Sequence, residues 1–166
     1  EADPKHTIAV LVDNEPGVLA RVVGLFSGRG YNIDSLTVAE VDTRRDRSRI
    51  NIVTSGNEMI IDQIRAQLER LVPVFNVVDL TEDGPSIERE LALIKVVATG
   101  ENRIEALRVA DIFRARAVDS TLGSFVFEVT GDSSKVNAFI DLMEPLGLAE
   151  VSRTGVVAIA RGADAM

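Results

Sequence analysis

The 166-residue sequence predicts an α+β protein with two ferredoxin-like domains, each with the element order β-α-β-β-α-β. Two observations predict this class. Apolar strand-like runs alternate with amphipathic helical segments, and the same order of elements occurs twice along the chain. We assign residues 1–80 to the first domain, 81–86 to a linker and 87–166 to the second domain.

The first predicted domain opens with a strand that is apolar on both faces, which is typical of the centre of a sheet. Its helices are recognised by apolar residues at helical spacing and end at glycine or proline. The elements are, in order, strand Thr7–Val12, a helix over residues 18–27, strands Ile33–Val41 and Ser48–Thr54, a helix from Asn57 with the stripe Ile60, Ile64, Leu68 and Leu71, and strand Val74–Leu80.

A polar Gly-Pro turn, TEDGPS, separates this domain from the second. The elements expected there are strand Glu90–Ala98, helix Asn102–Arg116, strands Ala117–Leu122 and Ser124–Thr130, a helix that ends at Pro145, and one or two strands within Ala149–Ala160. The first of these helices carries apolar residues that we expect mostly on one side: Ile104, Leu107, Val109, Ile112 and Phe113.

Composition limits the function. The net charge of −8 and a pI near 4.7 argue against nucleic acids and anionic membranes as partners. No apolar run approaches the roughly 20 residues that span a bilayer, and no secretory signal is visible, so we expect a cytoplasmic protein. The chain has no cysteine and a single histidine, His6, expected to be a bystander, so we predict no catalytic and no metal-binding residues.

The expected sheet order places the second and fourth strands at the edges. The second strand carries few charges that would deter pairing with another strand. Something also has to cover the second apolar face of the first strand. Homodimerisation meets both needs, and we predict a homodimer.

The stretch Asp13–Gly17, DNEPG, joins the first strand directly to the first helix. Asp, Asn, Pro and Gly are common at helix starts, so an ordinary cap is one interpretation. The other is a ligand site in which Gly17 lets a carboxylate approach free N–H groups at the positive end of the helix. Asn14 suits a zwitterion, and Glu15 could meet an ammonium group. Asn32 of a second copy could approach this turn.

Other polar clusters favour surface roles. The glycines at 24, 28 and 30 fit neither a dinucleotide fingerprint nor a P-loop. The arginine-rich run Thr43–Arg49 is expected to be a solvated hairpin tip rather than a phosphate site. Four acids near the start of the second domain are expected on the solvated surface: Glu88, Glu90, Glu101 and Glu105.

Long segments closely resemble the small, regulatory subunit of acetolactate synthase. They are HTIAVLVDNEPGVLARVVGLFSGRGYNIDSLTV, SRINIVTSG, ERELALIKV and VSRTGVVAIARG. The resemblance implies that residues 1–80 form an ACT domain, a module that binds amino acids at a dimer interface. It implies valine as the feedback inhibitor, with leucine or isoleucine as alternatives. The site that it implies comprises Asn14, Glu15, Pro16, Gly17, Val18 and Leu19 of one subunit and Asn32 and Ile33 of the other.

The same resemblance implies that this chain is not itself an enzyme and carries no cofactor. Thiamine diphosphate, Mg²⁺ and FAD are expected on the catalytic, large subunit, which condenses two pyruvates, or pyruvate with 2-oxobutyrate, in branched-chain amino acid biosynthesis. The small subunit would activate that partner and make it sensitive to valine. Two alternatives stay open: an ACT-domain sensor for a different enzyme, and a small ferredoxin-like enzyme that uses Asp13 or Glu15.

Overall fold

A computed structural model describes residues 2–166 and divides them into two compact units. The first unit contains the chain up to Ile87 together with Val156–Met166, and the second contains Glu88–Gly155. The chain therefore passes from one unit to the other twice. None of the helices in residues 2–166 is long and apolar enough to span a membrane.

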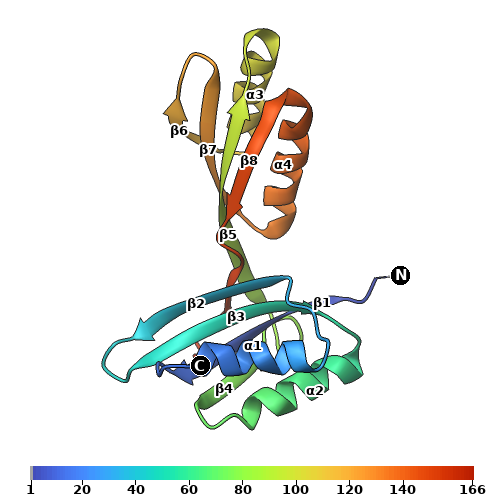
Figure 1. Cartoon of the computed structure of the whole chain (residues 1–166), viewed down its shortest axis with the longest axis vertical. Helices are drawn as coiled ribbons and strands as arrows, with labels where there is room; N and C mark the ends of the chain where they lie inside the picture. The colour runs from blue at the N-terminus through green and yellow to red at the C-terminus, as the bar shows by residue number, and fades with distance from the viewer. Residues whose placement is uncertain (1) are drawn as a thin grey trace. The chain divides into compact units, whose positions relative to one another are not determined.

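The first unit is a four-stranded antiparallel sheet in the order β2-β3-β1-β4, with α1 and α2 on one face (Figure 1). Its β1 and β3 are central, and β2 and β4 are edges, as predicted. The elements are β1 (Lys5–Asp13), α1 (Val18–Gly28), β2 (Ser35–Asp42), β3 (Arg47–Ser55), α2 (Glu58–Glu69) and β4 (Val74–Asp79).

The second unit repeats this plan with the strand order β6-β7-β5-β8. Its elements are β5 (Ser86–Val97), α3 (Gly100–Ile112), β6 (Arg116–Ser120), β7 (Ser124–Gly131), α4 (Ser133–Gly147) and β8 (Leu148–Arg153). The last strand of the chain, β9 (Val157–Ala160), also pairs with β5, whose first two residues belong to the first unit. Two sheets, each with a pair of helices, confirm the predicted fold class.

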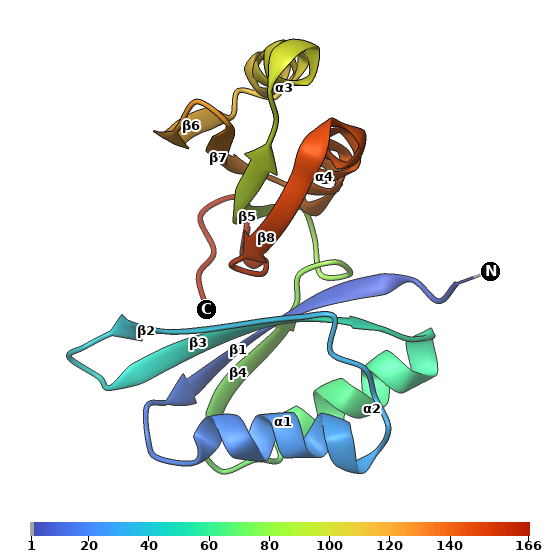
Figure 2. The same ribbon diagram turned by 45° about the horizontal axis from the view of Figure 1, so that its top comes forward.

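The centre of the first unit is β1, which is buried on both faces. Ile8, Val10 and Val12 point into the core under α1 and α2. Ala9 points to the other face, where it packs with Leu80 and with Ala158 from the C-terminal segment 156–166. Figure 2 shows the helices on one side of this sheet and the C-terminus on the other.

The C-terminal segment is fastened to the outer face by hydrogen bonds as well as by apolar contact. The N–H of Val156 donates to Ser35 Oγ at 2.8 Å, and the carbonyl of Val156 accepts from Thr37 Oγ1 at 3.3 Å. Arg49 donates from Nη2 to the carbonyl of Ala158 at 2.7 Å. The chain's own C-terminal segment thus covers the face for which the sequence predicts a second copy.

The compact units also differ from the predicted domains. Residues 156–166, predicted to belong to the second domain, are part of the first compact unit. Gly155, at φ 85°, separates β8 from this segment, and Arg161 N–H then donates to the carbonyl of Pro85 at 2.9 Å. The physical reason is the buried outer side of β1, which Ala158 helps to cover.

Three details of the second unit were predicted wrongly. In α3 the core side is formed by Ala106, Val109 and Ala110, whereas Ile104, Leu107 and Ile112 are exposed. That helix ends at Ile112 rather than Arg116, because Arg114 takes a left-handed conformation with φ 57°. Pro145 does not end α4.

The helix continues beyond this proline to Gly147, so Pro145 removes one N–H donor from the last turn without ending the helix. Gly147 has φ 118°, and the backbone there approaches the carbonyl of Val97 so closely that a Cβ atom would collide with it. A glycine at 147 is therefore a steric requirement of the turn into β8.

Two buried polar groups differ from the predictions, which made His6 a bystander and placed Glu90 on the solvated surface. His6, 4% exposed, shares a hydrogen bond with Asp79 through Nδ1 at 2.9 Å, so it is a structural residue. Glu90 is also 4% exposed and accepts from Arg153 at 2.7 and 3.0 Å and from Ser133 Oγ at 2.7 Å. The carboxylates of Asp79 and Glu90 are therefore both paired, as burial requires.

We expect Ala158→Asp to detach the C-terminal segment, because it would place an unpaired carboxylate against Ala9 and Leu80. The free energy of unfolding should fall by about 2–3 kcal/mol, measured by urea denaturation, and the amides of 156–160 should exchange faster. Ile159→Asp is the matched control, since Ile159 is 59% exposed. Equal losses in both variants would contradict the docking of Ala158.

The buried, hydrogen-bonded carboxylate of Glu90 should make the folding stability of the second unit sensitive to acid. The hydrogen bonds from Arg153 and Ser133 hold the pKa of Glu90 below its ordinary value. The stabilisation is therefore complete above the unfolded-state pKa and is lost as the pH falls through the folded-state pKa. We expect Glu90→Gln to lower the free energy of unfolding at pH 7 by about 1–3 kcal/mol. Urea denaturation at pH 7 and near pH 3 should show this difference shrinking in acid, while the exposed control Glu144→Gln changes little at either pH.

Candidate functional site

The predicted turn lies where β1 ends and α1 begins. Two backbone hydrogen bonds fix its start: Asn14 N–H donates to the carbonyl of Asp46 at 2.6 Å, and Glu15 N–H donates to that of Asp13 at 2.9 Å. Gly17 is the N-cap residue, with φ 83° and ψ −4°. These angles favour glycine. A Cβ added at Gly17 would meet no atom within 4 Å, so the space beside it is open in the single chain.

The start of α1 has no side-chain cap and no acid in its first turn. By contrast, Asn57 caps α2 through Ile60 N–H, and Asp132 caps α4 through Lys135 N–H. Within residues 2–166, no hydrogen bond partner occupies the N–H groups of Gly17, Leu19 and Ala20. The interpretation of the turn as an ordinary side-chain cap is therefore wrong, and its free donors and positive helix end remain available to an anion.

The other residues of the turn differ in what they offer. Glu15 is exposed, and its carboxylate lies 3.8 Å from the guanidinium of Arg21. Val18 is buried in the core, whereas Leu19 is 38% exposed. Pro16 is exposed and has no N–H. The turn thus presents backbone donors and the Leu19 side chain, while the side chain of Val18 belongs to the interior.

Asn32 and Ile33 lie just before β2. Asn32 is exposed, its carbonyl accepts from Thr54 Oγ1 at 2.6 Å, and its Nδ2 donates to Asp34 Oδ1 at 2.5 Å. Ile33 is half-buried at the margin of the first core. Strand β2 beside them is an edge strand with an exposed apolar residue, Val38, at 43%.

A single chain does not bring these two groups together. Ser35 is opposite Val53, which is also opposite Thr7, so the start of β2 lies level with the start of β1. Asp13 and Asp42 are both opposite Arg47, so the turn lies level with the far end of β2. Six strand residues separate the two levels, about 20 Å along the sheet.

The arginine-rich hairpin adjoins the turn through Asp46. Arg44 and Arg45 are exposed at its tip, as predicted. Arg47 instead lies over the ring of Phe75 at 3.8 Å, and Arg49 holds the C-terminal segment. Partial burial lowers the pKa of Arg49 from its usual high value. Two of the four arginines are therefore structural.

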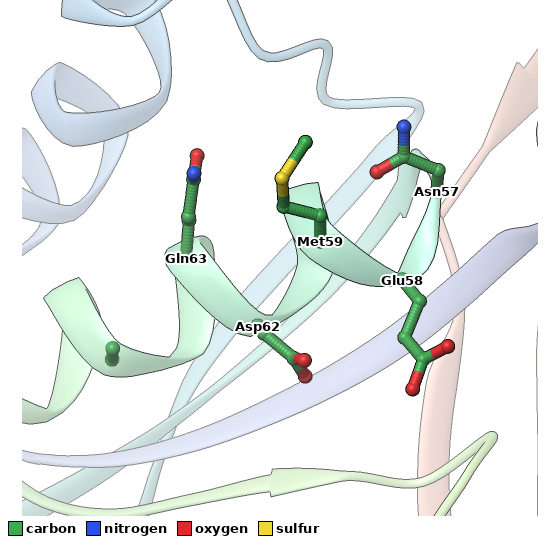
Figure 3. Close-up of a pocket in the computed structure, with 6 residues that line it drawn as sticks. Asn57, Glu58, Met59, Asp62 and Gln63 are labelled. Atoms are coloured by element: carbon green, nitrogen blue, oxygen red, sulfur yellow. The ribbon is translucent and has the colours of Figure 1, made fainter.

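A shallow, open hollow lies elsewhere, on the exposed side of α2 (Figure 3). Its lining comes only from α2 and its cap residue: Asn57, Glu58, Met59, Asp62, Gln63 and Ala66. Because one helix supplies every wall, the hollow cannot enclose a ligand in this chain. Within residues 2–166, no group of three or more His, Cys, Asp or Glu residues has a geometry that could hold a metal ion.

Comparison with known proteins identifies the family. Residues 8–76 match the family described as the AHAS small subunit-like ACT domain, and residues 89–162 match the family described as the small subunit of acetolactate synthase. A probable acetolactate synthase small subunit from Archaeoglobus fulgidus is 53% identical over 158 residues, which cover 95% of this chain and 98% of that protein. The chain belongs to the acetolactate synthase small-subunit family.

Other members agree. The small subunit from Aquifex aeolicus is 47% identical, over 95% of this chain and 81% of its own length. The crystal structure of the small subunit from Thermotoga maritima is 39% identical, superposes with a TM-score of 0.85, and covers 97% of this chain and 99% of that one. The resemblance noted in the sequence is thereby confirmed, as is an ACT domain in the first half.

Proposed function

We propose that this small-subunit chain activates the catalytic subunit of acetolactate synthase and makes it subject to feedback inhibition by valine. Valine would bind between the ACT domains of two copies. The partner would carry thiamine diphosphate, Mg²⁺ and FAD, and would perform the condensation of pyruvate with a second 2-oxo acid. This chain would supply regulation and no catalytic group.

The observation that carries this proposal is the separation of the two half-sites. The turn and the pair Asn32–Ile33 lie at opposite ends of β2 in one chain. If two copies pair antiparallel along β2, the start of each strand lies beside the end of the other. Asn32 and Ile33 of one copy then approach the Asn14–Leu19 turn of its partner, and the twofold symmetry creates two equivalent sites.

The edge of β2 suits such pairing. Its backbone is unpaired on the outer side, and Val38 and Val41 are exposed by 43% and 55%. Val38 is opposite Ile50, a core residue under the helices, so its side chain points to the helix-covered face. Pairing of two edges would extend the sheet and bury these residues.

Within the shared site, the carboxylate of valine would accept hydrogen bonds from the free N–H groups at the start of α1. The isopropyl group would contact Leu19 of the same copy and Ile33 of the partner. Because the ligand touches both copies, it can bias how they pair. A coupling free energy of about 1–3 kcal/mol would give strong feedback if valine prefers the less activating arrangement.

We expect Gly17→Asp to abolish valine binding and leave the fold intact. The new carboxylate would fill the open space and repel that of valine, and the positive φ should cost about 1 kcal/mol. Gly100→Asp is the matched control, because Gly100 also has a positive φ, 60°, and open space at the start of α3. Calorimetry with valine and thermal melting check both variants, and unchanged valine affinity in Gly17→Asp would refute the site.

A mixing experiment tests whether the site is shared. Gly17→Asp and Asn32→Ala should each lose valine binding as homodimers. Unfolding and refolding them together at equal amounts should restore about one quarter of the sites, because half of the dimers are mixed and each has one intact site. No recovery on mixing, despite exchange of subunits measured by mass spectrometry, would contradict a site built from two copies.

Reconstitution with the catalytic subunit tests the regulatory role itself. Adding this chain should raise the rate of acetolactate formation, and titration with valine, leucine and isoleucine should show which of them reverses the increase. Turnover of pyruvate by this chain alone would favour the alternative of a small enzyme.

A further inference from the structure

Asn32 is fixed to the sheet by its neighbours. Its carbonyl accepts from Thr54 Oγ1, and its side-chain Nδ2 donates to Asp34 Oδ1 at 2.5 Å. The second oxygen of Asp34 accepts from Ser55 Oγ at 2.9 Å, and the N–H of Asp34 donates to the carbonyl of Val53 at 2.8 Å. Asp34 is an exposed residue as a whole, although its side chain is only 24% exposed. The Asn32 amide is therefore held in one orientation.

That orientation decides what Asn32 offers to a ligand. An ionised carboxylate can only accept hydrogen bonds, so the amide turns its NH₂ group toward Asp34. The amide oxygen is then the group left for other partners. An oxygen acceptor next to a carboxylate attracts an ammonium group and repels an anion.

The other charged groups of the proposed two-copy site do not take over this role. Glu15 lies beside Arg21, at 3.8 Å. Lys5 Nζ is 3.9 Å from Asp34 Oδ2, but its side chain is 70% exposed, so it screens Asp34 only weakly. Asp34 is thus the acid that orients the Asn32 amide and supplies negative charge at the start of β2.

We propose that Asp34 is a positioning residue that makes the Asn32 half-site selective for the ammonium group of an α-amino acid. The inference rests on the proposed function and adds its specificity. Ligand polarity is fixed by the two halves: the carboxylate binds at the α1 start of one copy, and the ammonium binds at Asn32 and Asp34 of the other. An acid of the same carbon skeleton that lacks the amino group should therefore bind poorly.

The test compares valine with 2-hydroxy-3-methylbutanoate, which replaces the ammonium with a neutral hydroxyl group. Affinities are measured by calorimetry on the full chain carrying Asp34→Ala, with Asp62→Asn as a control that removes one exposed negative charge on α2. We expect Asp34→Ala to weaken valine about 10- to 100-fold and the hydroxy acid less than about threefold. The control should change neither affinity.

A variant that exchanges the residues at 32 and 34 should restore valine binding. In Asn32→Asp/Asp34→Asn the amide at 34 can hold a carboxylate at 32, which would face the ammonium directly. Valine affinity should return to within about threefold of the natural chain, while the hydroxy acid binds less tightly than before. Unfolding midpoints establish that each variant is folded.

The outcomes separate this inference from the proposed function. If the natural chain binds no valine, the proposed function fails. If it binds valine but Asp34→Ala weakens valine and the hydroxy acid equally, or weakens neither, the role of Asp34 is refuted. If the natural chain does not bind the hydroxy acid, selectivity for ammonium is supported, and failure of the swap variant to recover valine binding would refute the role of Asp34.

Discussion

The first unit depends on one constraint: β1 lies at the centre of its sheet and is buried on both faces. From His6 to Val10 every residue is at most 4% exposed. The helices can cover only one face, since both pack on the side of Ile8, Val10 and Val12. The chain therefore returns to this sheet after completing the second unit, and Ala158 covers the face that carries Ala9. Covering β1 on both faces takes its apolar side chains out of water, which stabilises the unit. It also requires contact between segments that are far apart in the chain, which costs loop-closure entropy.

This constraint shows why prediction from sequence succeeded for the elements and failed for the unit boundary. The apolar pattern of β1 predicted a central strand that needed cover on both faces, and the register confirms its position. The cover could not be found from local periodicity, because β9 has four residues and pairs far along the chain. In α3 the period was recognised but the buried side was wrong. Its small Ala106 and Ala110 fit against the sheet, and the bulkier Ile104 and Ile112 do not enter the core.

The candidate site, too, could be predicted from the sequence only in part. Local chemistry identified the turn, because a glycine with positive φ and a helix start follow directly from DNEPG. The absence of a side-chain cap could not be predicted, since both Asp13 and Asn14 are able to cap. Nor could the offset of about 20 Å along the sheet between the level of the turn and the level of Asn32, which follows from the strand register. The contact of Asn32 with Asp34 joins residues only two positions apart, yet it needs the support of Ser55 from β3.

The covering of both faces also limits how a second copy can approach. On the helix side, α1 and α2 occupy the first sheet; on the outer side, the C-terminal segment binds Ser35 and Thr37 of β2 and Arg49 of β3. A partner cannot stack on either face at this position without displacing packed residues. The backbone edge of β2 remains, and it carries Asn32 and Ile33 at one end. If a second copy completes the proposed site, it has to pair edge to edge, and the antiparallel direction is the one that joins unlike ends of β2.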